Sequence, residues 1–272
     1  GCLTGIAIAL FHWPAAGPFL WTHVLVVIPV ILMSSFSALI TASVGALLVT
    51  NFKLVPLTFP FQVVTWTWLL VAQSSTHFPL GERSVLPTLP SVNVYTEPVN
   101  TTGFAGVSLG TPVYNGTETA LAVLTGIAQI FLCDKWYSGV VMLLGIAICS
   151  PISSAMALMG SGIAQLIGIG LGFSFSTLES GLLAYDATLT AISIGGFFFV
   201  LDGWKVALMA ISSAILCTLA HVALAKVFAV LGLPVLTFPF TVTTWLYCLL
   251  LGSVKGVVPV AIASLTAPED HL

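Results

Sequence analysis

The octapeptide Leu233-Pro-Val-Leu-Thr-Phe-Pro-Phe240 separates two long apolar segments of this sequence. A near-copy lies far upstream, Leu54-Val-Pro-Leu-Thr-Phe-Pro-Phe61. Both copies share Thr-Phe-Pro-Phe, and both continue into an apolar run that carries a tryptophan, Trp66 or Trp245. Two copies of a polar, helix-breaking octapeptide inside hydrophobic sequence indicate a duplicated structural unit.

Each octapeptide predicts the beginning of a helix. Pro239 has no N–H group, so it is tolerated in the first helical turn, where the backbone N–H groups are unpaired anyway. Thr237, two residues earlier, is a favourable N-cap residue. If this helix begins at membrane depth, its backbone has to line a buried or wet cavity. Threonine hydroxyls and phenylalanine rings there would suit a small, planar, uncharged polar solute. The alternative is a proline-started helix at the membrane surface.

The composition identifies an integral membrane protein. Of the 272 residues, 58% are hydrophobic and 6% are charged, and the mean hydropathy is +1.13. Soluble domains carry about 25% charged residues, so this chain cannot form a water-facing surface. The long apolar runs predict an all-α polytopic protein. No basic patch points to nucleic acid, and no motif points to a metal or other cofactor.

Several apolar segments are long enough to span a bilayer, which takes about 20 residues. The first segment, Gly1–His12, is shorter and reads as the tail of a helix whose beginning lies before residue 1. The other expected helical segments are 22–49, 58–73, 138–149, 154–173, 178–201, 204–231 and 237–254.

One long polar stretch lies between the two octapeptides, at 74–119. It carries two N-x-[ST] sequons, at Asn100 and Asn115, which favour a glycosylated loop on the extracellular side. We therefore divide the chain into the C-terminal part of a first repeat, an extracellular loop, a second repeat and a tail, at 1–75, 76–119, 120–256 and 257–272.

The order of features repeats along the chain. A helix with small residues, a long Ala/Ser-rich helix, the octapeptide and a further helix occur once over Gly1–Phe61 and again over Ala187–Phe240. We expect about one and a half copies of a repeat, with the missing half before residue 1. Ala120–Leu132 is too short to span, so it is either a re-entrant helix or a helix that continues from the loop.

The residues of the second octapeptide resemble the L-P-x-x-T-x-P-F signature of the urea transporter family. The first copy departs from it at Val55, where the signature has proline. Gly126–Asp134 is similar to the family's pore helix, and Tyr185–Gly196 is similar to a pore-lining segment in which Asp186 takes the place of asparagine. Gly1–Gly5 resembles the continuation of that segment in the first repeat.

The resemblance implies a passive channel with two inverted repeats of five transmembrane helices, re-entrant pore helices and one pore in each protomer of a homotrimer. On this resemblance, we expect the N-terminal repeat to be truncated in this sequence. The resemblance also implies site residues. Threonines would line the centre of the pore, namely Thr58 and Thr237, and the pore-helix residue Gln129 would serve an outer or inner site. Aromatic residues would flank the centre, with Phe61, Phe240 and Phe131 as candidates. Leucines of the two pore-lining segments complete the set, Leu3 and Leu189.

Asp186 is the departure with the most consequence. An acid within a transmembrane segment is costly and is a functional candidate, whereas near a helix end it would cap the helix or meet water. His12, His23 and His221 have no acidic partner nearby in the sequence, so we expect them to be interfacial or packed polar residues.

The function expected from these observations is passive transport of urea by a multi-pass protein of the plasma membrane, with the lipid bilayer and two further copies of the chain as its partners. The alternative is a scaffold of the same fold that does not transport, or that selects another small neutral solute such as ammonia or water. A membrane enzyme is not expected, because no catalytic or metal-binding constellation is present.

Overall fold

The computed structural model describes residues 1–12, 24–78, 80–81, 115–251 and 254–272. Apart from one isolated bridge, the regular secondary structure of this part of the chain is helical. The expected all-α class is confirmed for these residues. The α-helices are α1 (Cys2–Phe11), α2 (Val27–Phe52), α3 (Phe59–Gln73), α4 (Gly116–Ala128), α5 (Trp136–Cys149), α6 (Pro151–Gly170), α7 (Phe175–Glu179), α8 (Tyr185–Ile192), α9 (Trp204–Val230) and α10 (Phe238–Leu251).

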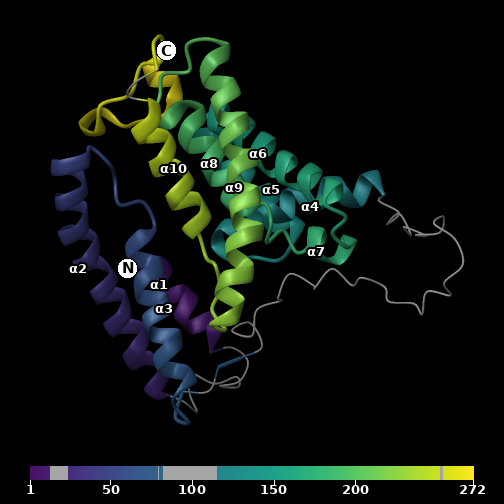
Figure 1. Cartoon of the computed structure of the whole chain (residues 1–272). Helices are drawn as coiled ribbons and strands as arrows, with labels where there is room; N and C mark the ends of the chain where they lie inside the picture. The colour runs from purple at the N-terminus through teal and green to yellow at the C-terminus, as the bar shows by residue number, and fades with distance from the viewer. Residues whose placement is uncertain (13–23, 79, 82–114, 252–253) are drawn as a thin grey trace, which may run out of the picture.

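The N-terminal helices α1–α3 form one side of the molecule, and α4–α7 form the other, with α8, α9 and α10 between them (Figure 1). Helix α1 packs against both α2 and α3. The indole Nε1 of Trp68 in α3 donates a hydrogen bond of 2.9 Å to Nε2 of His12, just after α1. His12 is therefore the packed polar residue that its sequence context predicts.

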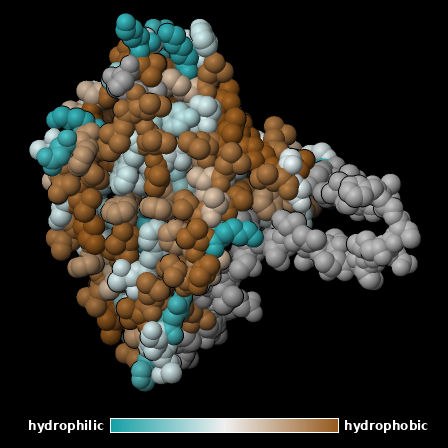
Figure 2. Space-filling model, in the orientation of Figure 1, coloured by the Kyte–Doolittle hydropathy of each residue, from teal (hydrophilic) through white to brown (hydrophobic). Residues whose placement is uncertain are grey.

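Three described helices, α2, α6 and α9, are long and apolar enough to cross a membrane. A bent pair, Gly116–Phe131 followed by Trp136–Cys149, adds a further candidate with an angle of 73° between its halves. Hydrophobic residues cover most of the face shown in Figure 2, and hydrophilic residues stand at its upper and lower ends. On α2, Ile31 and Leu39 expose about 60% of their surface. This exterior suits lipid.

Small residues allow close contact of helices on the C-terminal side. A Cβ atom added to Gly160 of α6 would lie 2.5 Å from the carbonyl oxygen of Ala187 in α8. A Cβ atom added to Gly126 of α4 would lie 2.6 Å from Cβ of Ala184. Helices in membranes pack in this way because lipid supplies no hydrophobic force between them, so close van der Waals contact has to hold them together.

Both octapeptides begin a helix, as their prolines predict. Helix α3 starts at Phe59 and α10 at Phe238, so the second proline of each copy is at the second helical position. The residue before each threonine has a positive φ, 47° at Leu57 and 51° at Leu236. Such angles are uncommon outside glycine. The same unusual turn therefore occurs in both copies.

The threonine of the first copy does not cap its helix through its side chain. Thr58 is the N-cap residue of α3, but its side chain makes no capping hydrogen bond. Its hydroxyl points instead to the other octapeptide. The tertiary contact thus replaces the local one.

The expected span at 178–201 is wrong, because turns divide this region into short helical pieces. It contains the end of α7, a turn at Gly181 with φ 71°, the eight-residue α8 and a π-helical segment at Ser193–Phe197. Within that segment Gly196 has φ 148°. Continuous helix cannot pass through such angles.

The remaining expected segments agree with the helices to within a few residues, with two extensions. Helix α4 begins at Gly116, inside the stretch assigned to the loop, because Asn115 caps it. Helix α6 begins at Pro151, where the Ser150 hydroxyl accepts a 3.0 Å hydrogen bond from the Ser153 N–H group. The Glu269 carboxylate accepts a 2.8 Å bond from the N–H group of Ile152, so the C-terminal tail also packs on this helix start.

Candidate functional site

The two octapeptides cross each other and exchange a pair of equivalent hydrogen bonds. The indole of Trp66, in the helix that follows the first copy, donates to the carbonyl oxygen of Pro234 over 2.6 Å. The indole of Trp245, in the helix that follows the second copy, donates to the carbonyl oxygen of Val55 over 2.8 Å. Pro234 and Val55 are the second residues of their octapeptides, so the two contacts are reciprocal.

The threonine hydroxyls meet at this crossing. Oγ1 of Thr237 donates to Oγ1 of Thr58 over 2.8 Å. Oγ1 of Thr241, one turn into α10, lies 3.1 Å from Oγ1 of Thr58. Thr237 and Thr241 are buried, and Thr58 is half-buried. The two signature threonines, 179 positions apart in the sequence, are thus in direct contact.

A fourth side chain completes this cluster, which we name the central ring: Thr58, Gln62, Thr237 and Thr241. Nε2 of Gln62 lies 3.0 Å from Oγ1 of Thr58, 3.0 Å from Oγ1 of Thr237 and 2.8 Å from Oγ1 of Thr241. Gln62 is completely buried. Sequence reasoning missed Gln62 and Thr241. The available signal was the helical spacing, because residues four apart lie on one face of a helix.

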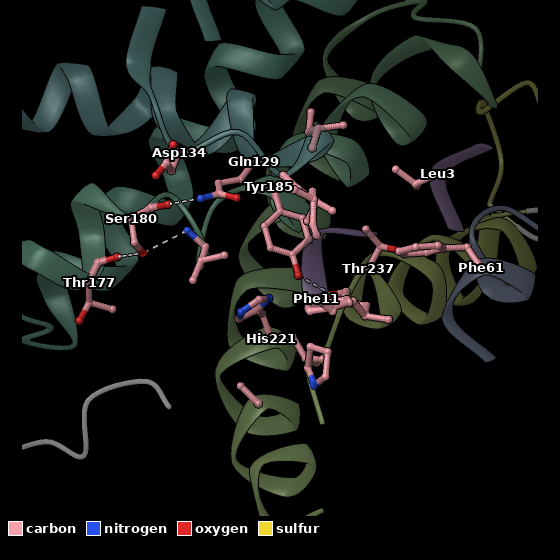
Figure 3. Close-up of a pocket in the computed structure, with 18 of the residues that line it drawn as sticks. Leu3, Phe11, Phe61, Gln129, Asp134, Thr177, Ser180, Tyr185, His221 and Thr237 are labelled. Carbon is pink, nitrogen blue, oxygen red and sulfur yellow. Dashed lines mark hydrogen bonds between the residues drawn. The ribbon is translucent and has the colours of Figure 1, made fainter. Parts of the chain in front are cut away.

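A cavity of about 660 Å³ leads to the central ring, and Thr237 lies on its wall (Figure 3). Three more of the expected site residues line it, Gln129, Phe61 and Leu3. Phe61 belongs to a buried apolar cluster with Phe11 and Leu236. The cavity therefore combines flat apolar walls with separate polar groups, as ligand sites for small molecules do. Its other polar lining residues are Asp134, Ser176, Thr177, Ser180, Tyr185 and His221.

Gln129 projects from the short 3₁₀ helix Gln129–Phe131 that follows α4. Its Nε2 donates a 2.7 Å hydrogen bond to the carbonyl oxygen of Ser180, in the turn between α7 and α8 (Figure 3). The side chain is 9% exposed. The bond to Ser180 therefore fixes Gln129 in the cavity wall.

Tyr185, Asp186 and His221 join α8 to α9 beside the cavity. Nδ1 of His221 lies 2.7 Å from Oδ2 of Asp186, so the imidazole and the carboxyl group are hydrogen-bonded to each other. Asp186 is completely buried and His221 is 4% exposed. Asp186 is thus no water-facing helix cap, and His221 does have an acidic partner, which the sequence hid because the partner is on another helix. His221 also faces the cavity.

The carbonyl groups that precede α10 already accept hydrogen bonds. The hydroxyl of Tyr185 donates to the carbonyl oxygen of Leu236, and Trp66 donates to that of Pro234. A carbonyl oxygen has a second lone pair, so each of these carbonyls can accept one further hydrogen bond.

The structure does not bring Phe131 and Leu189 to this cavity. Both line a second cavity of about 700 Å³, between α4, α5 and the C-terminal tail. Phe131 is 57% exposed. Phe240 is buried in α10 at 5% exposure, one turn from Thr237, and is not among the residues that line the first cavity.

The two sequons differ in what the structure describes. Asn115 is exposed, and its Oδ1 accepts a 3.2 Å hydrogen bond from the N–H group of Thr117 at the start of α4. Asn100 lies outside the described residues. Among the described residues, no group of three His, Cys, Asp or Glu side chains could hold a metal ion.

Comparison with known proteins gives a consistent result. The family model of the urea transporters matches residues 1–252. Urea transporter 1 of Ovis aries is 29% identical over 160 residues, which is 59% of this chain and 41% of that protein. Urea transporter 1 of Mus musculus is 24% identical over 270 residues, which is 99% of this chain and 64% of that protein. The chain thus spans less than two thirds of the length of these relatives. On the match over 1–252, the chain belongs to the urea transporter family.

Proposed function

We propose that this chain forms part of a passive, channel-like path for urea across a membrane. The observation that carries the proposal is the central ring, in which hydroxyls of both octapeptides meet at the end of a cavity with apolar walls. Urea transporter 1 of sheep and mouse, to which the chain is similar, supports urea as the solute.

The chemistry of the lining fits a neutral amide. Urea has two NH₂ groups that need acceptors and one carbonyl that needs a donor. A threonine hydroxyl can act as either, and the Gln129 carboxamide also presents both kinds of group. The flat ring of Phe61 faces the same cavity (Figure 3). Desolvating a neutral solute costs far less than desolvating an ion, so a path with mostly uncharged lining groups favours a neutral solute.

We also propose the finer architecture that the family resemblance implies. In this architecture, two inverted repeats cross at the octapeptides, and the α4 region forms a re-entrant pore helix. The reciprocal bonds of Trp66 and Trp245 support a two-fold relation between the copies. The bend of 73° after Phe131 supports a helix that turns back within the membrane.

The assembly and location are part of the same proposal. The functional protein is a homotrimer in the plasma membrane, with one path in each protomer. The loop that contains Asn100 and Asn115 is extracellular and carries glycans. The exposure of Asn115 supports this assignment for one of the two sequons.

The experiment that tests the function is a permeability measurement. The full-length protein that contains this chain is reconstituted in liposomes, and urea, ammonia and water fluxes are measured by stopped-flow light scattering. We expect urea flux well above that of protein-free liposomes, and a saturable dependence on urea concentration. Urea flux equal to that of protein-free liposomes would refute the proposal.

A second candidate function has one observation in its favour. The central ring is closed by its own hydrogen bonds, so the scaffold could be silent or could select ammonia or water. The same measurement separates these outcomes, because ammonia or water flux without urea flux would identify a differently selective channel. Background flux for all three solutes would identify a silent scaffold.

A further inference from the structure

The two octapeptides are followed by different residues at the position that completes the central ring. The first copy has Gln62 four residues after Thr58, and the second has Thr241 four residues after Thr237. Because residues four apart lie on one face of a helix, both side chains point to the crossing. The longer glutamine reaches across to the opposite copy, whereas the hydroxyl of Thr241 bonds back to the carbonyl oxygen of Thr237 over 3.1 Å.

The Gln62 carboxamide has a donor side that is fully used. Its Nε2 is within 3.0 Å of three threonine hydroxyls, Thr58, Thr237 and Thr241. An NH₂ group has two hydrogens, so the three oxygens share them. The hydroxyls expected to bind solute are therefore occupied by a side chain of the same chain.

The acceptor side of the same group is empty. Oε1 of Gln62 is buried and accepts no hydrogen bond from the described residues. A buried acceptor without a donor is unfavourable, because it has lost its hydrogen bonds to water and has gained none in the protein. A threonine, the residue that the second copy has at this position, would leave no such oxygen. Gln62 therefore brings a local cost that packing alone does not explain.

The side-chain carboxamide of glutamine has a carbonyl and one NH₂ group. It therefore resembles urea, which has a carbonyl and two NH₂ groups. We propose that the Gln62 carboxamide takes the place of urea in the central ring, and that it has to rotate out for a solute to pass. Residue 62 thus limits the flux and favours solutes that can offer the threonines an equivalent N–H group. The unpaired Oε1 is the acceptor for an N–H group of the incoming amide. This inference rests on the proposed function and adds a gate to it.

The decisive variant is Gln62→Thr, which copies the residue of the second octapeptide. In the full-length protein in liposomes, we expect urea flux to rise by about tenfold, as when the barrier falls by the strength of one to two hydrogen bonds. Water flux should rise at least as much, because an open ring no longer requires an amide. Gln62→Ala serves as a second variant if the threonine variant does not fold.

The matched control is Gln73→Thr, at the end of the same helix. The Nε2 group of Gln73 donates to the carbonyl oxygen of Gly232, and the side chain is exposed. We expect unchanged urea flux in this variant. If wild-type protein carries urea and Gln62→Thr is no faster, the gate is refuted while the proposed function stands.

A second measurement tests the gate independently of urea transport. Thr237→Cys is introduced with and without Gln62→Thr, and the rate of modification by a small methanethiosulfonate reagent is corrected for the chain's own cysteines. We expect modification on the order of tenfold faster when Gln62 is replaced, for the same reason. If no variant carries urea, the proposed function fails. In that case, faster labelling of Thr237→Cys when Gln62 is replaced still supports a central ring closed by Gln62. An unchanged labelling rate overturns the closure of the ring by Gln62.

Discussion

The first octapeptide, Leu54–Phe61, and the second, Leu233–Phe240, follow the same turn into a helix, yet they are held differently. Tyr185 donates a hydrogen bond to the carbonyl oxygen of Leu236, the residue with the positive φ angle in the second copy. Among the described residues, no side chain donates to the carbonyl of Leu57, its equivalent in the first copy. The second copy is thus braced by α8 and α9, whereas the first depends on its contact with the second.

This difference shows that the two copies of a duplicated unit can have different structural roles. The second copy has the complete signature, and its threonine lies on the cavity wall. The first copy has Val55 instead of proline and contributes Gln62, which fills the centre. One copy is therefore fixed in place, and the other supplies the group that we propose to move.

The largest effect is expected from breaking the buried pair that joins α8, the helix that braces the second copy, to α9. Asp186→Leu leaves His221 without its acidic partner, and breaking a buried pair by removing one member costs about 3–5 kcal/mol. We expect a loss of thermal stability in detergent, measured by fluorescence-detected size-exclusion chromatography. Asp186→Asn keeps a hydrogen-bond acceptor for His221 and serves as the control. Equal stability of the leucine variant and the wild type would show that the Asp186–His221 pair does not hold α8 to α9.

Substitutions of Trp66 and Trp245 test whether the two copies contribute equally to the stability of their contact. Trp66 stacks on Phe228 with ring centroids 4.6 Å apart and also contacts Phe238, whereas Trp245 contacts Phe59 at 5.5 Å. Both tryptophans are part-buried, so replacing either by alanine costs less than the loss of about 3–5 kcal/mol for a fully buried tryptophan. Because an aromatic pair adds about 0.5–1.5 kcal/mol, we expect Trp66→Ala to be about 1 kcal/mol more destabilising than Trp245→Ala.

The measurement is the midpoint of thermal unfolding of both variants in the same detergent. The variants Trp66→Phe and Trp245→Phe are the controls, since each removes the hydrogen bond and keeps an aromatic ring. We expect similar, smaller losses for these two. A larger loss for Trp245→Ala than for Trp66→Ala contradicts the assignment of the additional aromatic contacts to the first tryptophan.

Thr237→Val tests the role of the second copy in transport. The variant keeps the shape of the side chain and removes the hydroxyl that meets Thr58 and Gln62 beside the cavity. We therefore expect urea flux to fall by about tenfold, or about 1.4 kcal/mol in the barrier. The measurement is stopped-flow urea permeability at equal protein density. Thr67→Val is the control, because the exposed Thr67 hydroxyl bonds to its own helix at Val63. Wild-type flux in Thr237→Val would exclude a central threonine site.

The smallest effect is expected from making the first copy more like the second. Val55→Pro restores the signature, and the neighbouring turns have nearly equal φ angles at Leu57 and Leu236. A compatible proline stabilises a protein by about 0.4–1 kcal/mol through the unfolded chain. We expect a small rise in the unfolding midpoint and no change in urea flux. A clear loss of stability would show that the two turns differ.

The sequence predicted the helix starts well because the signal is local. Proline excludes all but the first turn of a helix, so α3 and α10 begin where the octapeptides indicate. The long apolar segments α2, α6 and α9 were also predicted within a few residues, because a continuous apolar run is a local signal as well. The segment 178–201 was not, because its hydropathy is that of one span, while the turns at Gly181 and Gly196 divide it.

The site was predicted in part. Thr58 and Thr237 were expected at the centre, and the structure brings their hydroxyls together. Gln62 could not be recognised from the sequence, because it differs from the equivalent Thr241. Its side chain meets the threonines of the second copy only where the two copies cross. His221 and Asp186 are 35 positions apart, and no spacing rule connects two residues of different helices.

The sequence by itself determined that this chain is a helical membrane protein of the urea transporter family, since composition, proline chemistry and the octapeptide are properties of short stretches. Only the tertiary structure decided which side chains fill the centre. The physical reason is that buried polar groups have to find partners, and in a membrane protein those partners are on other helices. Gln62, Tyr185 and Asp186 found theirs across the molecule, and Phe131, which resemblance placed at the site, lies at another cavity.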